Sequence, residues 1–169
     1  METVEWELAS PLNSIYSVGT YTGAWMERTF TNHGEDSIYV TAAPFSDLVL
    51  DSNEFAKLDE VWRYAFDEEV GTIPPRAVTD RAIKYGRQKR ESQRLVVHYM
   101  QPHFPSLAHP ELGSELQPDT DGWPASIWTR LENGEVTEET VWEAYRSNLE
   151  FVIDEVELLL NNIDTKKFS

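Results

Sequence analysis

The run Leu95-Val96-Val97, within the stretch RLVVHYMQPHFP of residues 94–105, constrains the fold more than any other feature of the chain. Consecutive apolar residues with β-branched side chains predict a strand buried on both faces, which is typical of a parallel sheet. The stretch then breaks into a loop that carries His103 and two prolines. Since open α/β sheets bind ligands beyond the carboxyl ends of their strands, we expect functional residues near this loop.

Strand-like and helix-like segments alternate along the rest of the chain. Short β-branched and aromatic runs predict strands, and apolar residues at spacings of three and four predict helices. We expect strands at residues 14–18, 37–42 and 94–99, and helices at residues 22–31, 76–91 and 138–160. This order predicts an α/β fold, a mostly parallel sheet with helices on both faces, in one domain over residues 1–169.

Three details complete this interpretation. The alternation places strand 94–99 at the centre of the sheet. Residues 45–75 have patchy helical character and are the hardest part to interpret. The stretch 104–136 is rich in proline and glycine, and we expect a short helix near Ile127 within it.

Helix boundaries are indicated by local chemistry. Pro75 suits the first helical position, because that residue needs no N–H donor. Thr137 is a good N-cap for the last helix, and the acidic residues Glu138 and Glu139 that follow it favour the helix dipole.

The chain has a formal net charge of −16, from 30 acidic and 14 basic side chains. Such a surface repels nucleic-acid phosphates and anionic lipids, so we expect no nucleic-acid and no membrane partner. Adaptation to high salt explains the charge better than a dedicated acidic interaction surface, because the acids are spread along the chain. The basic cluster from Arg81 to Arg94 fits a helix C-terminus better than an anion site.

Cysteine content and hydropathy limit which kinds of site and which cellular location the sequence is compatible with. No cysteine is present, which excludes disulfides, thiolate metal ligands and a cysteine nucleophile. No apolar run approaches the roughly 20 residues that span a bilayer. The N-terminal METVEWELAS lacks the basic and apolar regions of a signal peptide, so we expect a soluble, cytoplasmic chain.

Thr20 and Thr22 lie between Gly19 and a predicted helix. Backbone N–H groups at a helix N-terminus can hold an anion, and a hydroxyl group there could attack phosphorus or sulfur. Ordinary capping by Thr22 is the better explanation on local grounds. A threonine nucleophile also needs a base or a metal for activation, and the sequence has no H-x-H or HExxH cluster, so no metal ligand is assigned.

Two histidines flank the end of the predicted strand 94–99. His98 lies within the strand and is interpreted as a hydrogen-bonded core residue. His103 lies in the loop, where it could donate to an anionic oxygen or bind a metal. Their HxxxxH spacing does not by itself define a metal pair.

Four stretches, taken in order, resemble the sulfatase-like proteins of the alkaline phosphatase superfamily, and more narrowly those common in haloarchaea. They are SVGTYTGAWMERTF, DSIYVTAAPF, LVVHYMQPHFPS and WEAYRSNLEFVIDEVELLLNNIDTKKF. The first resembles the segment with the family's nucleophile at a helix N-terminus, and the second resembles the strand that follows. The third resembles the central strand and loop, and the fourth the long helix that leads to a metal-binding strand. The resemblance covers most of the chain.

The resemblance implies a metal-dependent hydrolase or transferase of phosphate or sulfate esters. Thr22 would occupy the nucleophile position, with Thr20 as a substrate-binding residue and the second candidate, and His103 would contact the substrate anion. The complete family domain is expected to bind a divalent metal through an aspartate on its first strand and an Asp-His-Gly motif. Neither is found at the matching place in the 169 residues. We therefore expect an alkaline-phosphatase/sulfatase-like fold that is incomplete at both ends, with no cofactor held by this chain.

Two hypotheses for function follow. In the first, the chain is a sulfatase-like ester hydrolase or transferase domain that is inactive in isolation. A complementing fragment or a homo-oligomer would complete it, and an anionic ester would be its substrate if it is active. In the second, it is a non-catalytic acidic module that binds a protein partner. The presence of metal ligands separates the two hypotheses.

Overall fold

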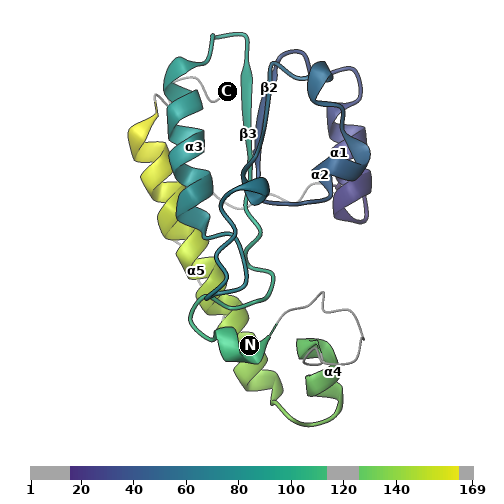
Figure 1. The fold of residues 1–169 in the computed structure, drawn as a ribbon, viewed down its shortest axis with the longest axis vertical. Helices are drawn as coiled ribbons and strands as arrows, with labels where there is room; N and C mark the ends of the chain where they lie inside the picture. Colours follow the sequence, from purple (N-terminus) through teal and green to yellow (C-terminus); the bar gives the residue numbers. More distant parts are fainter. Residues whose placement is uncertain (1–15, 114–125, 164–169) are drawn as a thin grey trace.

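A computed structural model of the protein describes residues 16–113 and 126–163. Its sheet has three parallel strands in the order β2-β1-β3 (Figure 1). The strands are β1 (Ser37–Thr41), β2 (Lys57–Glu60) and β3 (Arg94–His98). The helices are α1 (Thr22–Phe30), α2 (Ser46–Val49), α3 (Pro75–Gln88), α4 (Ile127–Glu132) and α5 (Glu138–Asn162), with short 3-10 turns at Ser52–Glu54, Val61–Arg63 and Pro110–Leu112.

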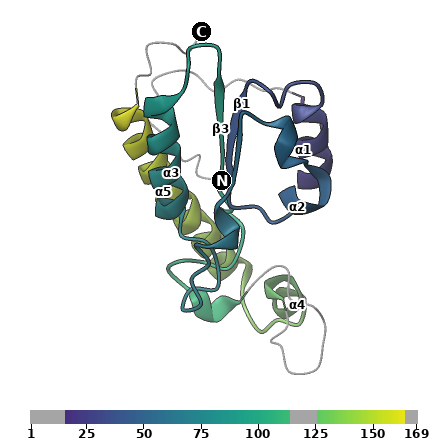
Figure 2. The same cartoon turned by 45° about the horizontal axis from the view of Figure 1, so that its top comes forward.

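Helices cover both faces of this sheet. Helices α1 and α2 lie on one face, and α3 and α5 lie on the other (Figures 1 and 2). Successive strand residues point to opposite faces. Accordingly Val40 packs in the cluster with Val78 of α3, whereas Tyr39 packs in the cluster with Phe30 of α1. The predicted α/β class, with a parallel sheet between helices, is confirmed for the described residues.

Strand β1 is the central strand of the sheet. All five of its residues are buried, whereas the four residues after Arg94 in β3 are only half-buried. Burying a side chain such as Val40 contributes roughly 1.5–3 kcal/mol, so β1 anchors both layers. The prediction that strand 94–99 is central is wrong for the described sheet. Strand order depends on long-range pairing that the apolar run of β3 does not encode.

The N-terminal residues of α3 and α5 match their predictions. Pro75 is the first residue of α3, where its fixed φ favours the helix and its missing N–H is not needed. Thr137 caps α5 by accepting a hydrogen bond from the N–H of Thr140. A separate apolar cluster joins α4 to the start of α5 through residues that include Ile127 and Val141. The short helix predicted near Ile127 is confirmed.

Two local predictions fail. Residues 16–18 do not form a strand, and residues 14 and 15 lie outside the described residues. The Ser17 hydroxyl instead donates to the carbonyl oxygen of Gly19 and holds a turn. The stretch 45–75 contains β2, which the sequence conceals because this edge strand carries Lys57, Asp59 and Glu60.

None of the helices in residues 16–113 and 126–163 is both long enough and apolar enough to cross a bilayer.

Candidate functional site

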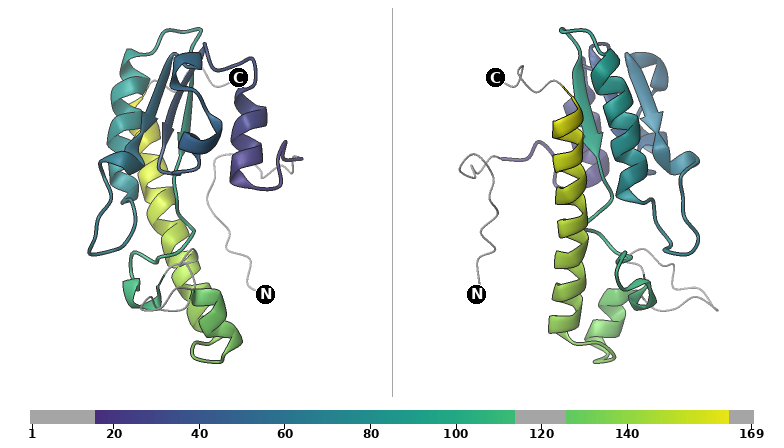
Figure 3. Two further views of the ribbon diagram at one scale, coloured as in Figure 1. Left: turned by 45° about the vertical axis from the view of Figure 1, so that its right-hand side comes forward. Right: turned by 90° about the vertical axis from the view of Figure 1, so that its left-hand side faces the viewer.

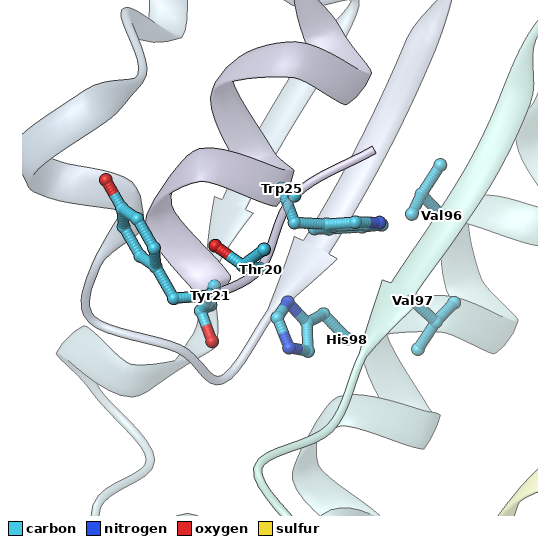
Figure 4. Close-up of a pocket in the computed structure, with 8 residues that line it drawn as sticks. Thr20, Tyr21, Trp25, Val96, Val97 and His98 are labelled. Carbon is cyan, nitrogen blue, oxygen red and sulfur yellow. The ribbon is translucent and has the colours of Figure 1, made fainter. Parts of the chain in front are cut away.

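Two adjoining cavities lie where β3 ends and α1 begins. The larger measures about 390 Å³ and is lined by Gly19, Thr20, Tyr21, Thr22, Trp25, Val96, Val97 and His98 (Figure 4). The smaller measures about 180 Å³ and is lined by Thr22, Ala43, Phe45, His98, Met100, His103 and Phe104. Thr22 and His98 line both cavities, which together are called the threonine–histidine cleft below.

The cleft brings together the residues singled out in the sequence. Thr22 shares the larger cavity with Thr20 and the smaller one with His103. Thr20 and His103 do not line a common cavity. The cleft therefore lies at the carboxyl end of a parallel strand, as expected for an open α/β sheet.

Gly19 allows the chain to enter α1 tightly. A Cβ at this position would collide with the backbone of Ala24 and Trp25, so a larger residue would push the helix start away. Arg28 of α1 reinforces the turn by donating to the carbonyl oxygen of Val18 at 2.7 Å. The path of residues 18–22 is thus set by close packing against the helix that it precedes.

Thr22 is the first helical residue of α1 and not its N-cap, which corrects the capping interpretation. Tyr21 occupies the N-cap position, and its side chain makes no capping hydrogen bond. The first turn also contains no acidic residue. Backbone N–H groups at such an end, with the positive end of the helix dipole, favour an anion.

His98 is neutral at neutral pH. Burial lowers its pKa, and the nearby charge of His103 lowers it further. Its Nδ1 atom lies 2.7 Å from the hydroxyl oxygen of Tyr39, whose own pKa burial raises well above the ordinary value. The Trp25 ring meets the imidazole edge to face at 5.6 Å between centroids. The core interpretation of His98 captures its hydrogen bond but misses that the ring also lines both cavities.

The hydrogen bond to Tyr39 holds the His98 ring in a fixed orientation. A protonated hydroxyl can donate to Nδ1 or accept from it. The imidazole proton resides on Nε2 when Tyr39 donates, and on Nδ1 when Tyr39 accepts.

Asn148 of α5 holds the loop that carries His103. It is fully buried, and its Nδ2 donates to the carbonyl oxygens of His103 at 3.0 Å and Pro105 at 3.1 Å. Its Oδ1 accepts from the N–H of Leu107 at 2.8 Å. Sequence reasoning missed this residue, although an asparagine next to Leu149 in the apolar stripe of a helix is a signal for a buried polar contact.

The two carboxylates at the C-terminal end of β2 each accept hydrogen bonds from side chains of other elements. The Glu60 carboxylate accepts from Ser46 at 2.7 Å and from Arg63 at 2.6 Å. Asp59 accepts from Arg81 at 2.6 Å. Burial acts to raise the pKa of Asp59, but hydrogen bonds from Arg81 and from Tyr64 outweigh it and leave the pKa below its ordinary value.

The donor set of the cleft does not fit the divalent metal that the family resemblance implies. The cleft is lined by hydroxyl groups and by two histidines, without a carboxylate. Within residues 16–113 and 126–163, no group of three or more histidine and acidic side chains could hold a metal ion. Hard divalent metals prefer carboxylate oxygens, so the cleft-lining residues do not supply the ligands that such a metal requires.

Comparisons with known proteins found no matching family model, no matching curated protein and no matching solved structure.

Proposed function

We propose that the threonine–histidine cleft binds the phosphate or sulfate group of an anionic ester. The observation that carries the proposal is the meeting of Thr22, His98 and His103 around one cavity at the start of α1. A helix N-terminus offers N–H donors and a positive dipole end, and imidazole N–H groups add side-chain donors. This combination suits tetrahedral oxyanions better than neutral ligands.

Each residue has a role in the proposal. Thr22 lies at the nucleophile position and Thr20 contributes a second hydroxyl to the same cavity. His103 contacts an anionic oxygen, and His98 donates from Nε2 in the tautomer in which Tyr39 donates to Nδ1. The wider proposal is a sulfatase-like domain of the alkaline phosphatase superfamily, ancestrally a hydrolase or transferase of phosphate or sulfate esters, that works in the cytoplasm.

Binding without turnover is the activity that the described residues support. A threonine hydroxyl is a weak nucleophile at neutral pH unless a base or a metal activates it. Asp47, two positions after the lining residue Phe45, pairs with Arg63, and Glu60 is engaged with Ser46 and Arg63. We therefore expect the purified chain to bind phosphate and sulfate but not to hydrolyse their esters.

Calorimetric titration with inorganic phosphate and with sulfate tests the proposal. Thr22→Ala and His103→Ala should each weaken binding at least about tenfold, since one charge-assisted contact is worth about 1.5–3 kcal/mol. Thr31→Ala and His109→Ala serve as controls, because both side chains are exposed and lie outside the cleft-lining residues. Equal binding by all four variants would refute the assignment.

The same protein should be assayed with p-nitrophenyl phosphate and p-nitrophenyl sulfate, with and without divalent metals. We expect no hydrolysis above background. Metal-dependent hydrolysis that Thr22→Ala abolishes would overturn the expectation of inactivity while supporting the nucleophile assignment.

The second candidate is a non-catalytic acidic module that binds a protein partner. The net charge of −16 and an open groove beside β3 favour it. Anion binding at the cleft separates the two candidates, since a pure protein-binding module has no need of it.

A further inference from the structure

Strand β3 has the composition of an interior strand but lies at an edge. Leu95, Val96 and Val97 form an uninterrupted apolar run of the kind found in strands covered on both faces. Within the described residues β3 pairs with β1 alone. Exposed edge strands usually carry prolines, bulges or inward charges that block pairing, and this run has none of these. The edge is therefore competent to pair.

At the outer edge of β3, alternate residues direct their backbone N–H and C=O groups away from β1. The two end residues of β3 direct their backbone groups toward β1 and the residues that flank it. Arg94 donates its N–H to the carbonyl oxygen of Asp36, and the carbonyl oxygen of His98 accepts from the N–H of Ala42. Consecutive residues of a parallel strand direct these groups to opposite sides. Leu95 and Val97 consequently direct their N–H and C=O groups away from β1.

A groove of about 620 Å³ runs along this edge. Its floor includes Leu95 and Val97, and its wall is formed by apolar residues of α5, among them Val156, Leu159 and Leu160. Leu160 is 43% exposed. Helix α5 lies on the side of β3 away from β2 (Figure 3, right), so it would cover one face of a further strand paired with β3.

The rim of the groove is basic. Lys89 and Arg94 line it together with the single acid Glu91, and the exposed Arg90 lies between them in sequence. The whole chain has a net charge of −16, so this rim is the opposite in sign to most of the surface. Charge complementarity thus favours an acidic occupant.

We propose that the outer edge of β3 binds a β-strand donated by a separate polypeptide, with apolar side chains at alternate positions and acidic side chains between them. The apolar side chains enter the groove against α5, and the backbone pairs with Leu95 and Val97. A second copy of this chain fits poorly, because edge-to-edge pairing would bring both α5 helices to the same place. This inference does not depend on the anion-binding proposal.

A synthetic peptide that alternates isoleucine with glutamate and is long enough to span β3 tests the inference on the full chain. Amide hydrogen exchange at Leu95 and Val97 should slow by about tenfold or more on binding, since both N–H groups become paired. Leu160→Glu should abolish peptide binding. Leu48→Glu, at an exposed position on α2, is the control that should leave binding unchanged.

Three outcomes would overturn the proposal. The first is the absence of any exchange effect at Leu95 and Val97, or equal binding of a peptide with the same residues in clustered order. The second is a dimer of the chain alone, seen by analytical ultracentrifugation, that Leu160→Glu dissociates. The third is peptide binding that appears only after residues 1–15 or 164–169 are deleted, which would make a segment of this chain the natural occupant.

Discussion

The Nδ2 atom of Asn148 donates to the carbonyl oxygen of His103 at 3.0 Å, across 45 positions of sequence. The asparagine belongs to α5 and the histidine to the loop after β3, so this contact ties the long helix to the candidate site. The same amide also binds Pro105 and Leu107, which fixes the part of the loop that follows the histidine.

Asn148→Ala should destabilise the protein. The change leaves buried carbonyl groups and one N–H without a partner, which costs about 1–3 kcal/mol in the free energy of unfolding. Chemical denaturation measures it. Asn161→Ala is the control, because that side chain is exposed on the same helix. A loss of stability no larger than the control's would contradict the role assigned to Asn148.

Tyr39→Phe should raise the pKa of His98. In the tautomer in which the tyrosine hydroxyl donates to Nδ1, it opposes protonation of the ring, and phenylalanine removes that donor while keeping the ring contact with Phe30 at 4.6 Å. Titration of the His98 ring signals by NMR measures the change. An unchanged or lower pKa would show that the hydroxyl is not the donor.

Stability should fall on mild acidification because of His98. Its folded-state pKa is lowered by burial and by His103, so it lies below the ordinary value of 6.5. Between the folded and unfolded pKa values the unfolded chain binds more protons, and stability rises with pH. The contribution of His98 is therefore complete above about pH 6.5 and is lost as the pH falls through the folded-state pKa.

Thermal unfolding of His98→Gln across this pH range checks the assignment. The variant should show a weaker pH dependence than the parent. His33→Gln, at an exposed position, should retain the dependence of the parent. Parallel curves for the parent and His98→Gln would place the acid sensitivity elsewhere.

Arg81→Ala should weaken the β2–α3 junction. Asp59 is 5% exposed and loses its 2.6 Å charged partner in this variant, which leaves the carboxylate with the tyrosine hydroxyls of Tyr64 and Tyr85. We expect a loss of about 1–3 kcal/mol in denaturant unfolding, reduced by the partial exposure of Arg81. The exposed Arg90→Ala is the control, and an equal effect in both variants would show that the ion pair contributes nothing.

Local sequence patterns predicted most of the helices and strands. They failed where the structure depends on contacts between segments that are distant in sequence. The apolar runs of β1 and β3, the proline at the start of α3 and the threonine cap of α5 are each encoded by neighbouring residues, and the structure confirms them. The central position of β1 is set by its pairing with two strands distant in sequence, so the composition of β3 misled the prediction. Strand β2 escaped prediction because its polar residues, such as Asp59, find partners on α3.

The candidate site shows the same division. Thr22 and His103 were chosen from their places beside a helix start and a strand end, and the structure brings them to one cavity. His98 looked structural because its strand position hid which face it occupies. The role of Asn148 could not be predicted from the sequence, because this residue binds a loop more than forty positions away.

The most direct test of the account follows the ring signals of His98 and His103 by NMR during titration with inorganic phosphate at neutral pH. Both sets of signals should shift with one saturating dissociation constant, and Thr22→Ala should weaken that constant about tenfold while the signals of His33 and His109 stay still. Signals that do not move, or that move equally in all four histidines, would contradict an anion site in the threonine–histidine cleft.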